Sequence, residues 1–168
     1  MALPKPDATL TLHPGAEPGT KHQYVSRIPA KGSPLAVCLQ LTHAISRAVR
    51  LEHVYEAALD AIETGLGVER AAVLVFEADG ASRVKAMRGL SDEESTTLDG
   101  QVPWAPGTTG ARPIPVPDVT RRPALLPNAA VMTRGNITAI TFVPLEGAEG
   151  VIGALGLCYA APHEHPPD

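Results

Sequence analysis

The sequence of 168 residues has few aromatic residues, only two cysteines and no long apolar run. Two cysteines are too few for a disulfide scaffold, so we expect a reducing environment and a cytoplasmic protein. No apolar stretch approaches the roughly 18 residues that a membrane-spanning helix needs. The N-terminal region also lacks the compact apolar stretch of a signal peptide. These absences exclude a secreted mini-protein and a membrane-spanning protein.

The charge balance and the hydrophobic content narrow the class further. A net charge of −4 argues against nucleic acid as the main partner. A hydrophobic content of 44% is too high for a wholly disordered chain, and the length suits one domain. We therefore expect a single globular domain with its own core.

The seventeen prolines are distributed unevenly along the chain. Residues 1–33 are rich in proline and show no apolar periodicity, so we predict a flexible leader or linker there. A short alternation at Leu10–Leu12 could instead add an edge strand. We predict the domain over 34–162 and a tail over 163–168. His163–His165 has a spacing that suits a metal, but we favour the simpler interpretation of a solvated terminus.

Residues 35 to about 66 show apolar positions at helical spacing. Ser33 and Pro34 are typical of a helix start, with Ser33 as the N-cap and Pro34 at the first helical position. The apolar positions are Leu35, Cys38, Leu39, Thr42, Ile45, Ala48 and Val49, followed by Leu51, Val54, Tyr55, Ala58, Leu59, Ile62 and Leu66. We predict one long or kinked helical segment that ends at Gly65 and Gly67.

A β-hairpin is predicted next. The apolar run 71–76 has strand length, and the turn residues 78–80 separate it from a second strand over 82–90. Strict alternation places Val84, Ala86 and Arg88 on one face of that second strand and Arg83, Lys85 and Met87 on the other.

A short helix and a proline-rich segment follow the hairpin. Ser91 and Glu94 have the spacing of a capping box and predict a helix that ends near Leu98. The stretch 113–117 contains three prolines, so we expect it to be extended and, if a strand, at a sheet edge. A further short helix is predicted over 127–134.

Two apolar runs, 137–145 and 151–159, close the predicted domain. Both are apolar on both faces, which is typical of central strands covered on both sides. The order of helices, hairpin, helix, edge strand, helix and hairpin predicts an α+β fold with a mainly antiparallel sheet.

This ordered series of segments resembles a GAF domain of the kind found in bacterial sensor histidine kinases and related signalling proteins. The segments that carry the resemblance are Glu69–Ala78, Arg88–Glu94, Val116–Val119, Ile137–Leu145 and Gly153–Leu157. The resemblance covers about residues 36–162. It implies a central antiparallel sheet of five or six strands, with long helices on one face, commonly a dimer interface. Loops and short helices over the other face would enclose a small-molecule pocket.

The ligand signatures of the best-studied family members are absent from this chain. The segment that corresponds to the bilin attachment region, about 118–130, has no cysteine. The pattern of the cyclic-nucleotide-binding members has no match, and His43 and His53 fall on the predicted helices rather than in a haem pocket. Family members usually continue into a further helix after the last strand. Residues 161–168 stop short of such a helix, so we expect a fragment of a longer protein rather than a domain that lacks this helix.

A ligand pocket of this family would involve the strands and the loop that covers them. Trp104 lies on a loop rich in proline and glycine, where a large aromatic side chain needs cover or a ligand. Arg88, if it points inward, needs a carboxylate such as Asp118 or a ligand anion, although it could instead reach solvent at the strand end. The candidate ligand-binding residues are Phe76, Arg88, Trp104, Val116, Asp118, Ile140, Phe142, Leu157 and Tyr159. The aromatic members of this set could equally be ordinary core residues.

The function expected from the resemblance is that of a sensory domain without catalytic activity. It would form a homodimer through helices in 35–66, bind an unidentified small molecule and pass a signal to an output domain outside this chain. Two alternatives stay open: a small reductase of methionine sulfoxide type that uses Cys158, and a ligand-free dimerisation module. No catalytic or metal-binding residues are predicted.

Overall fold

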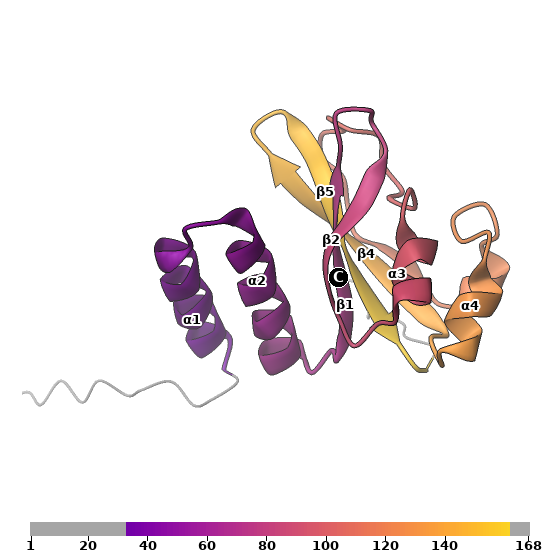
Figure 1. The fold of residues 1–168 in the computed structure, drawn as a ribbon, viewed down its shortest axis with the longest axis horizontal. Coiled ribbons are helices and arrows are strands. Elements are labelled where there is room, and N and C mark those ends of the chain that lie inside the picture. The colour runs from indigo at the N-terminus through magenta and orange to yellow at the C-terminus, as the bar shows by residue number, and fades with distance from the viewer. Residues whose placement is uncertain (1–32, 162–168) are drawn as a thin grey trace, which may run out of the picture.

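The computed structural model describes residues 33–161 (Figure 1). The predicted leader, the strand suggested at Leu10–Leu12 and the His163–His165 cluster lie outside the described residues. The elements are α1 (Pro34–Arg47), α2 (Leu51–Leu66), β1 (Arg70–Phe76), β2 (Ser82–Arg88), α3 (Asp92–Leu98), β3 (Ile114–Val116), a 3₁₀ turn (Val119–Arg121), α4 (Ala129–Arg134), β4 (Ala139–Gly147) and β5 (Gly150–Tyr159). No helix among residues 33–161 is long and apolar enough to cross a membrane.

The strands form one five-stranded sheet in the order β2-β1-β5-β4-β3, and every neighbouring pair is antiparallel. The predicted α+β class and antiparallel sheet are therefore confirmed. β3 lies at the sheet edge, where Pro115, which has no N–H to donate, pairs with Thr141. The predicted edge position of the proline-rich segment follows from that missing donor.

The two N-terminal helices form an antiparallel hairpin rather than the one long or kinked segment predicted from the sequence. Ser33 caps α1 as predicted, because its hydroxyl accepts the Ala36 N–H at 3.3 Å. The chain becomes extended at Ala48 and Arg50, which separates α1 from α2. The end of α2 lies beside the start of α1, since a Cβ at Gly65 would approach Val37 Cγ2 to 2.9 Å. The apolar periodicity on both sides of this break gave no sign of the reversal.

The predicted assignment of β2 side chains to the two faces of the sheet is wrong, because the strand contains a bulge. Val73 pairs with Ala86 but Leu74 pairs with Val84, so Lys85 is an extra residue on β2. A bulge reverses the alternation for every residue beyond it. Ala86 therefore packs on the α2 side of the sheet, whereas Val84 packs on the opposite side with Met87.

The sheet separates two apolar clusters. One face is covered by α2 (Figure 1), which packs Tyr55, Leu59 and Ile62 against the sheet. On the other face, α3, α4 and the loops around them cover a larger cluster that includes Phe142 and Met132. The predicted capping box starts α3: the Glu94 carboxylate accepts the Ser91 N–H at 2.6 Å, and the Ser91 hydroxyl accepts the Glu94 N–H at 3.3 Å.

Arg88 fastens α2 to the end of β2. Its guanidinium forms ion pairs with three carboxylates spaced along one face of α2: Glu56 at 3.1 Å, Glu63 at 3.1 Å, and Asp60. The hydrogen bonds with Glu63 and Asp60 raise the pKa of Arg88, so the side chain stays charged. Among residues 33–161, Arg88, with 31% of its side chain exposed, is the only cation paired with these three carboxylates, and it offsets their mutual repulsion.

Replacing Arg88 is expected to loosen α2. Arg88→Met leaves three like charges on adjacent turns, so the free energy of unfolding should fall by about 1 kcal/mol. Urea denaturation followed by circular dichroism measures this change. Arg83→Met is the matched control, because Arg83 pairs with a single described carboxylate, Asp79 at 4.0 Å, and otherwise donates to the Ser82 carbonyl at 3.1 Å, so its loss should cost less. High salt should reduce the difference between the two variants, and an equal loss in both would contradict the role of Arg88.

Replacement of Gly153 in the central strand β5 is expected to destabilise the fold. A Cβ at this position would clash with the Leu74 carbonyl oxygen of β1, whereas the nearest atom to a Cβ at Gly156 is 3.7 Å away. Gly153→Ala should lower the free energy of unfolding by about 1–3 kcal/mol through overpacking. Gly156→Ala is the control and should be close to neutral. Thermal unfolding of both variants tests this, and equal melting temperatures would show that the backbone contact is not limiting.

Candidate functional site

The predicted pocket residues on the α3/α4 face are buried in an apolar cluster. Val116, Ile140 and Phe142 are at most 1% exposed, and Trp104 packs against their cluster. Leu126, Met132 and Ile137, which are fully buried, fill the space beneath the covering helices and loops. The bulk of this face is thus occupied by the chain's own side chains.

Leu157 and Tyr159 lie on the opposite face of the sheet. Both belong to the cluster that packs under α2. Burial raises the pKa of Tyr159, against the opposing effect of its hydrogen bond with Thr141. Because Ile140 pairs directly with Cys158, the neighbouring Leu157 must point the other way. The predicted residues of β4 and β5 therefore do not line a common pocket.

The two predicted charged residues are also separated. Arg88 binds carboxylates of α2, so it does not pair with Asp118, which was one of the partners that the sequence left open. Asp118 caps the 3₁₀ turn, where its carboxylate accepts the Thr120 hydroxyl at 2.6 Å and the Thr120 N–H at 2.9 Å. Asp118 also pairs with Arg121 at 3.1 Å. These contacts, the Thr120 hydroxyl first, lower the pKa of Asp118 and give its charge a structural role.

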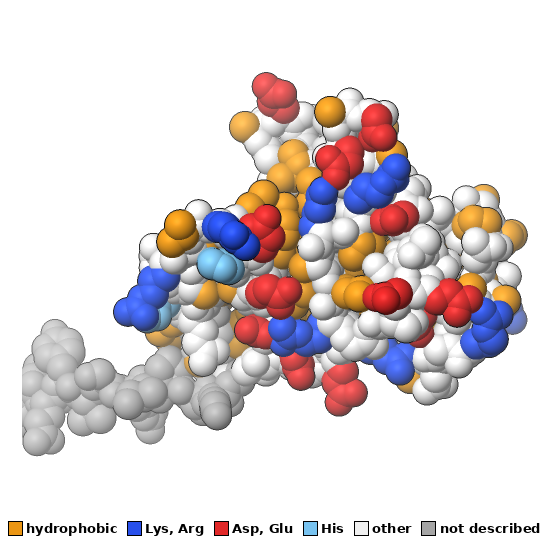
Figure 2. Space-filling model, viewed as in Figure 1, with side chains coloured by type: hydrophobic (Ala, Val, Ile, Leu, Met, Phe, Trp, Pro, Cys, Tyr) orange, Lys and Arg blue, Asp and Glu red, His pale blue; other side chains and the backbone are white. Residues whose placement is uncertain are grey.

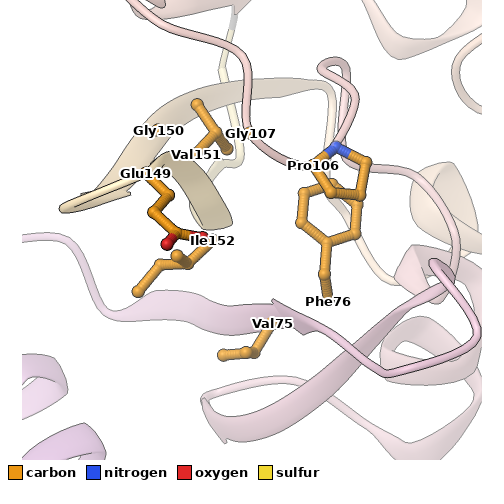
Figure 3. A pocket seen from close by; sticks show the side chains of 8 residues that line it. All are labelled: Val75, Phe76, Pro106, Gly107, Glu149, Gly150, Val151 and Ile152. Carbon is orange, nitrogen blue, oxygen red and sulfur yellow. The ribbon is translucent and has the colours of Figure 1, made fainter.

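An open cleft lies at the end of the sheet, where β1 and β5 separate (Figure 3). It has a volume of about 410 Å³ and is lined by Val75, Phe76, Pro106, Gly107, Glu149, Gly150, Val151 and Ile152. The pairing of β1 with β5 ends at Val75 and Gly153, just below this opening. Phe76 is the only one of the predicted ligand-binding residues that lines the cleft.

A bulge in β5 shapes one wall of the cleft. Leu145 pairs with Gly153 while Glu146 pairs with Val151, so Ile152 is the extra residue on β5. Ile152 is 51% exposed as a result. An apolar side chain is thereby presented at the rim instead of being packed in the core.

The loop that holds Pro106 is fastened to β5. The Gly107 N–H donates to the Val151 carbonyl at 2.9 Å, and the Val151 N–H donates to the Thr108 carbonyl at 2.9 Å. A Cβ at Gly150 would collide with the Gly107 carbonyl oxygen and come within 2.8 Å of that of Thr108. Gly150, at φ +106°, therefore permits the close approach that holds this wall in place.

Sequence reasoning missed Glu149, Ile152 and Pro106 as cleft residues. Pro106 lies on the loop rich in proline and glycine, and Glu149 lies between the two predicted apolar runs. The cleft depends on a strand bulge and on a loop docking across some forty positions of sequence, and neither leaves a local pattern. The proline and glycine content around position 106 was the one available signal, because such a loop is stiff enough to form a wall.

The two cysteines lie in contrasting environments. Cys38 is exposed on α1, and Cys158 is buried on the α3/α4 face of β5. Burial, together with the nearby Glu94 carboxylate, raises the pKa of the Cys158 thiol to about 12. Cys158 therefore remains a neutral thiol near pH 7, in which form it is a poor nucleophile. Among residues 33–161, no group of three His, Cys, Asp or Glu residues is arranged to hold a metal ion.

Comparison with solved structures identifies the fold family. A domain of a protein described as a two-component sensor histidine kinase from Sinorhizobium meliloti 1021 is 33% identical, with a TM-score of 0.61. The match covers 71% of this chain and 79% of that one.

More distant structures share the fold. The GAF domain of a phosphoenolpyruvate-protein phosphotransferase from Coxiella burnetii has a TM-score of 0.60 at 16% identity, with 79% of this chain and 80% of that one covered. The phycocyanobilin-bound GAF domain of a cyanobacterial phytochrome has a TM-score of 0.55 at 15% identity, with 79% and 82% covered. No family model and no curated protein sequence matches the chain. The shared sheet and helices, together with the 33% identity to the sensor-kinase domain, show that this chain belongs to the GAF-domain family.

Proposed function

We propose that this GAF domain is a sensory module of a bacterial signalling protein that passes a signal to an output domain outside the chain. The similarity to a domain of a sensor histidine kinase supports a place in a two-component system. We further propose that the domain works as a homodimer in the cytoplasm. The exposed, free thiol of Cys38 fits a reducing compartment.

The observation that carries the proposal is the distribution of exposed apolar side chains. Of the large hydrophobic residues exposed in the described part of the chain, all but Ile152 lie on the helical hairpin. They are Leu35, Leu39, Ile45, Val49, Leu51 and Leu66. Figure 2 shows apolar side chains at the surface of the lobe that α1 and α2 form. Such a concentration is typical of a protein interface.

The outer stripe of α1 is suited to a second copy of the same chain. α1 contacts α2 with a stripe that includes Val37 and the half-buried Leu41, whereas Leu35 (61% exposed) and Leu39 (54% exposed), one helical turn apart on another face, form its outer stripe. No residue of α1 is fully buried, so the helix has little packing of its own. The outer stripe carries no charge, so two copies can pair through it without like-charge repulsion.

The same hairpin offers a route for the signal. Val75 lines the cleft and also packs in the cluster beneath α2. Arg88 joins the neighbouring strand to α2 through its ion pairs. We propose that occupancy of the cleft shifts β1 and β2 and thereby α2, which changes how α1 pairs with its copy. A ligand acts in this way only through different affinities for the two arrangements.

Dimerisation is expected to depend on the outer stripe of α1. In sedimentation equilibrium the unmodified chain should form a dimer, and Leu39→Glu should raise the dimer dissociation constant at least about tenfold, because an unpaired carboxylate would be buried. The variant should keep its fold, since Leu39 is exposed and belongs to neither apolar cluster of the sheet.

Gln40→Glu provides the matched control for this experiment. It adds the same charge to α1 at an exposed position off the outer stripe, so the dimer should persist. A monomeric unmodified chain, or equal weakening by the two substitutions, would refute a dimer built on this stripe.

A ligand-free dimerisation module is the second candidate, supported by the filled α3/α4 face. The reductase alternative is less favoured because its proposed nucleophile, Cys158, is a buried neutral thiol.

Thiol titration tests the reductase alternative. With a chromogenic disulfide reagent at neutral pH, one thiol of the native chain should react at once and the second only after denaturation, since Cys158 is buried. Cys38→Ser should abolish the fast phase, and Cys158→Ala should leave it intact. Fast native reaction of Cys158, accompanied by methionine sulfoxide reduction, would restore the enzyme hypothesis.

A further inference from the structure

We propose that the cleft between the diverging ends of β1 and β5 binds a small organic cation with an apolar or aromatic body. The inference rests on the proposed sensory function and specifies the chemical class that the sensor would detect.

The cleft presents apolar surface outside the helical hairpin. Ile152 is the one large hydrophobic residue exposed elsewhere in the described part of the chain, and it lines the cleft. Val75, Phe76 and Pro106 extend this apolar lining. An apolar ligand body would cover side chains that water now contacts, which favours binding. The volume of about 410 Å³ lies within the usual range of small-molecule sites.

The charge at the cleft selects a cation. Of the described residues that line it, Glu149 is the only ionisable one. The Glu149 carboxylate has no hydrogen bond or ion pair with any of residues 33–161. The cations of the neighbouring β1–β2 hairpin are already engaged, because Lys85 pairs with Glu77 and Arg83 with Asp79. A ligand that carries an ammonium group would therefore meet an unpaired carboxylate, whereas an anion would be repelled.

The carboxylate that would bind the cation and the aromatic ring that would bind the apolar body lie on different sides of the cleft. In Figure 3, Glu149 and Ile152 lie on one side of the opening, and Phe76 and Pro106 lie on the other. An aromatic or aliphatic body can rest against the Phe76 ring while an ammonium group reaches the Glu149 carboxylate. The Phe76 ring also attracts a nearby cation through its π face.

The loop of Pro106 and strand β5, which form the two sides of the cleft, are held together in the absence of a ligand. The loop of Pro106 is bonded to β5 through Gly107 and Val151, and Gly150 permits the close approach. A cleft that is already formed costs little ordering on binding. Val75 lines the cleft and also packs in the cluster beneath α2. A ligand in the cleft would therefore touch a side chain that packs beneath the proposed signalling helix.

Titration of the ¹⁵N-labelled full chain with 2-phenylethylammonium chloride, followed by NMR, tests the inference. Saturable shifts should appear at the amides of Phe76, Gly107 and Ile152. Glu149→Gln should weaken binding about three- to fivefold, the effect of losing one exposed ion pair. Titration with 3-phenylpropionate, which has a similar body and the opposite charge, should give no saturable shifts.

Glu146→Gln is the matched control, because Glu146 is exposed on the same β4–β5 hairpin but does not line the cleft. It should leave the affinity for 2-phenylethylammonium unchanged. The inference is overturned if the amine gives no saturable shifts, if the carboxylate binds as well, or if the two substitutions act equally. Saturable binding of the carboxylate alone would leave a sensory cleft with another ligand class. The sedimentation experiment reports on the dimer separately, so a failed cleft and a failed dimer are distinguishable.

Discussion

The central strand β5 is the constraint on which the rest of the domain depends. It pairs with β1 on one side and with β4 on the other, and its side chains enter both apolar clusters. The close approach of β1 to β5 requires that Gly153 have no side chain. Because Leu157 and Cys158 must be buried on opposite faces, both faces of the sheet need cover. α2 provides it on one face, and α3, α4 and their loops provide it on the other.

This arrangement decides where a cavity can exist. The α3/α4 face is filled by aliphatic side chains around Phe142, so close packing leaves little space over the middle of the sheet. The pairing of β5 with β1 stops at Gly153, and the next residue, Ile152, is bulged. A cleft forms there because two strands separate beneath a loop that is bonded to one of them. Binding sites commonly lie at such margins, where loops are held by a rigid sheet.

The helical hairpin is attached to the sheet unequally. α2 is held by apolar packing around Leu59 and by the ion pairs of Arg88, whereas α1 contacts α2 and leaves its own apolar stripe exposed. Because α1 packs against α2 and is exposed on its other side, a change in how it pairs with a second copy costs little free energy. Such an element suits a domain that passes a small displacement of its strands to a neighbouring chain.

Local chemistry in the sequence determined most of the elements. The Ser33 cap, the capping box of Ser91 and Glu94, the edge position of Pro115 and the two-sided burial of β5 were predictable, because each depends on neighbouring residues. The candidate site was not predictable to the same degree. A strand that is apolar on both faces, such as β5, gives no indication of which side chains share a cavity. A bulge at Lys85 or at Ile152 reverses faces without any sequence signal. The reversal between α1 and α2, the ion pairs of Arg88 and the cleft at Glu149 were decided only by tertiary structure, since each brings together residues whose positions the rest of the fold must first establish.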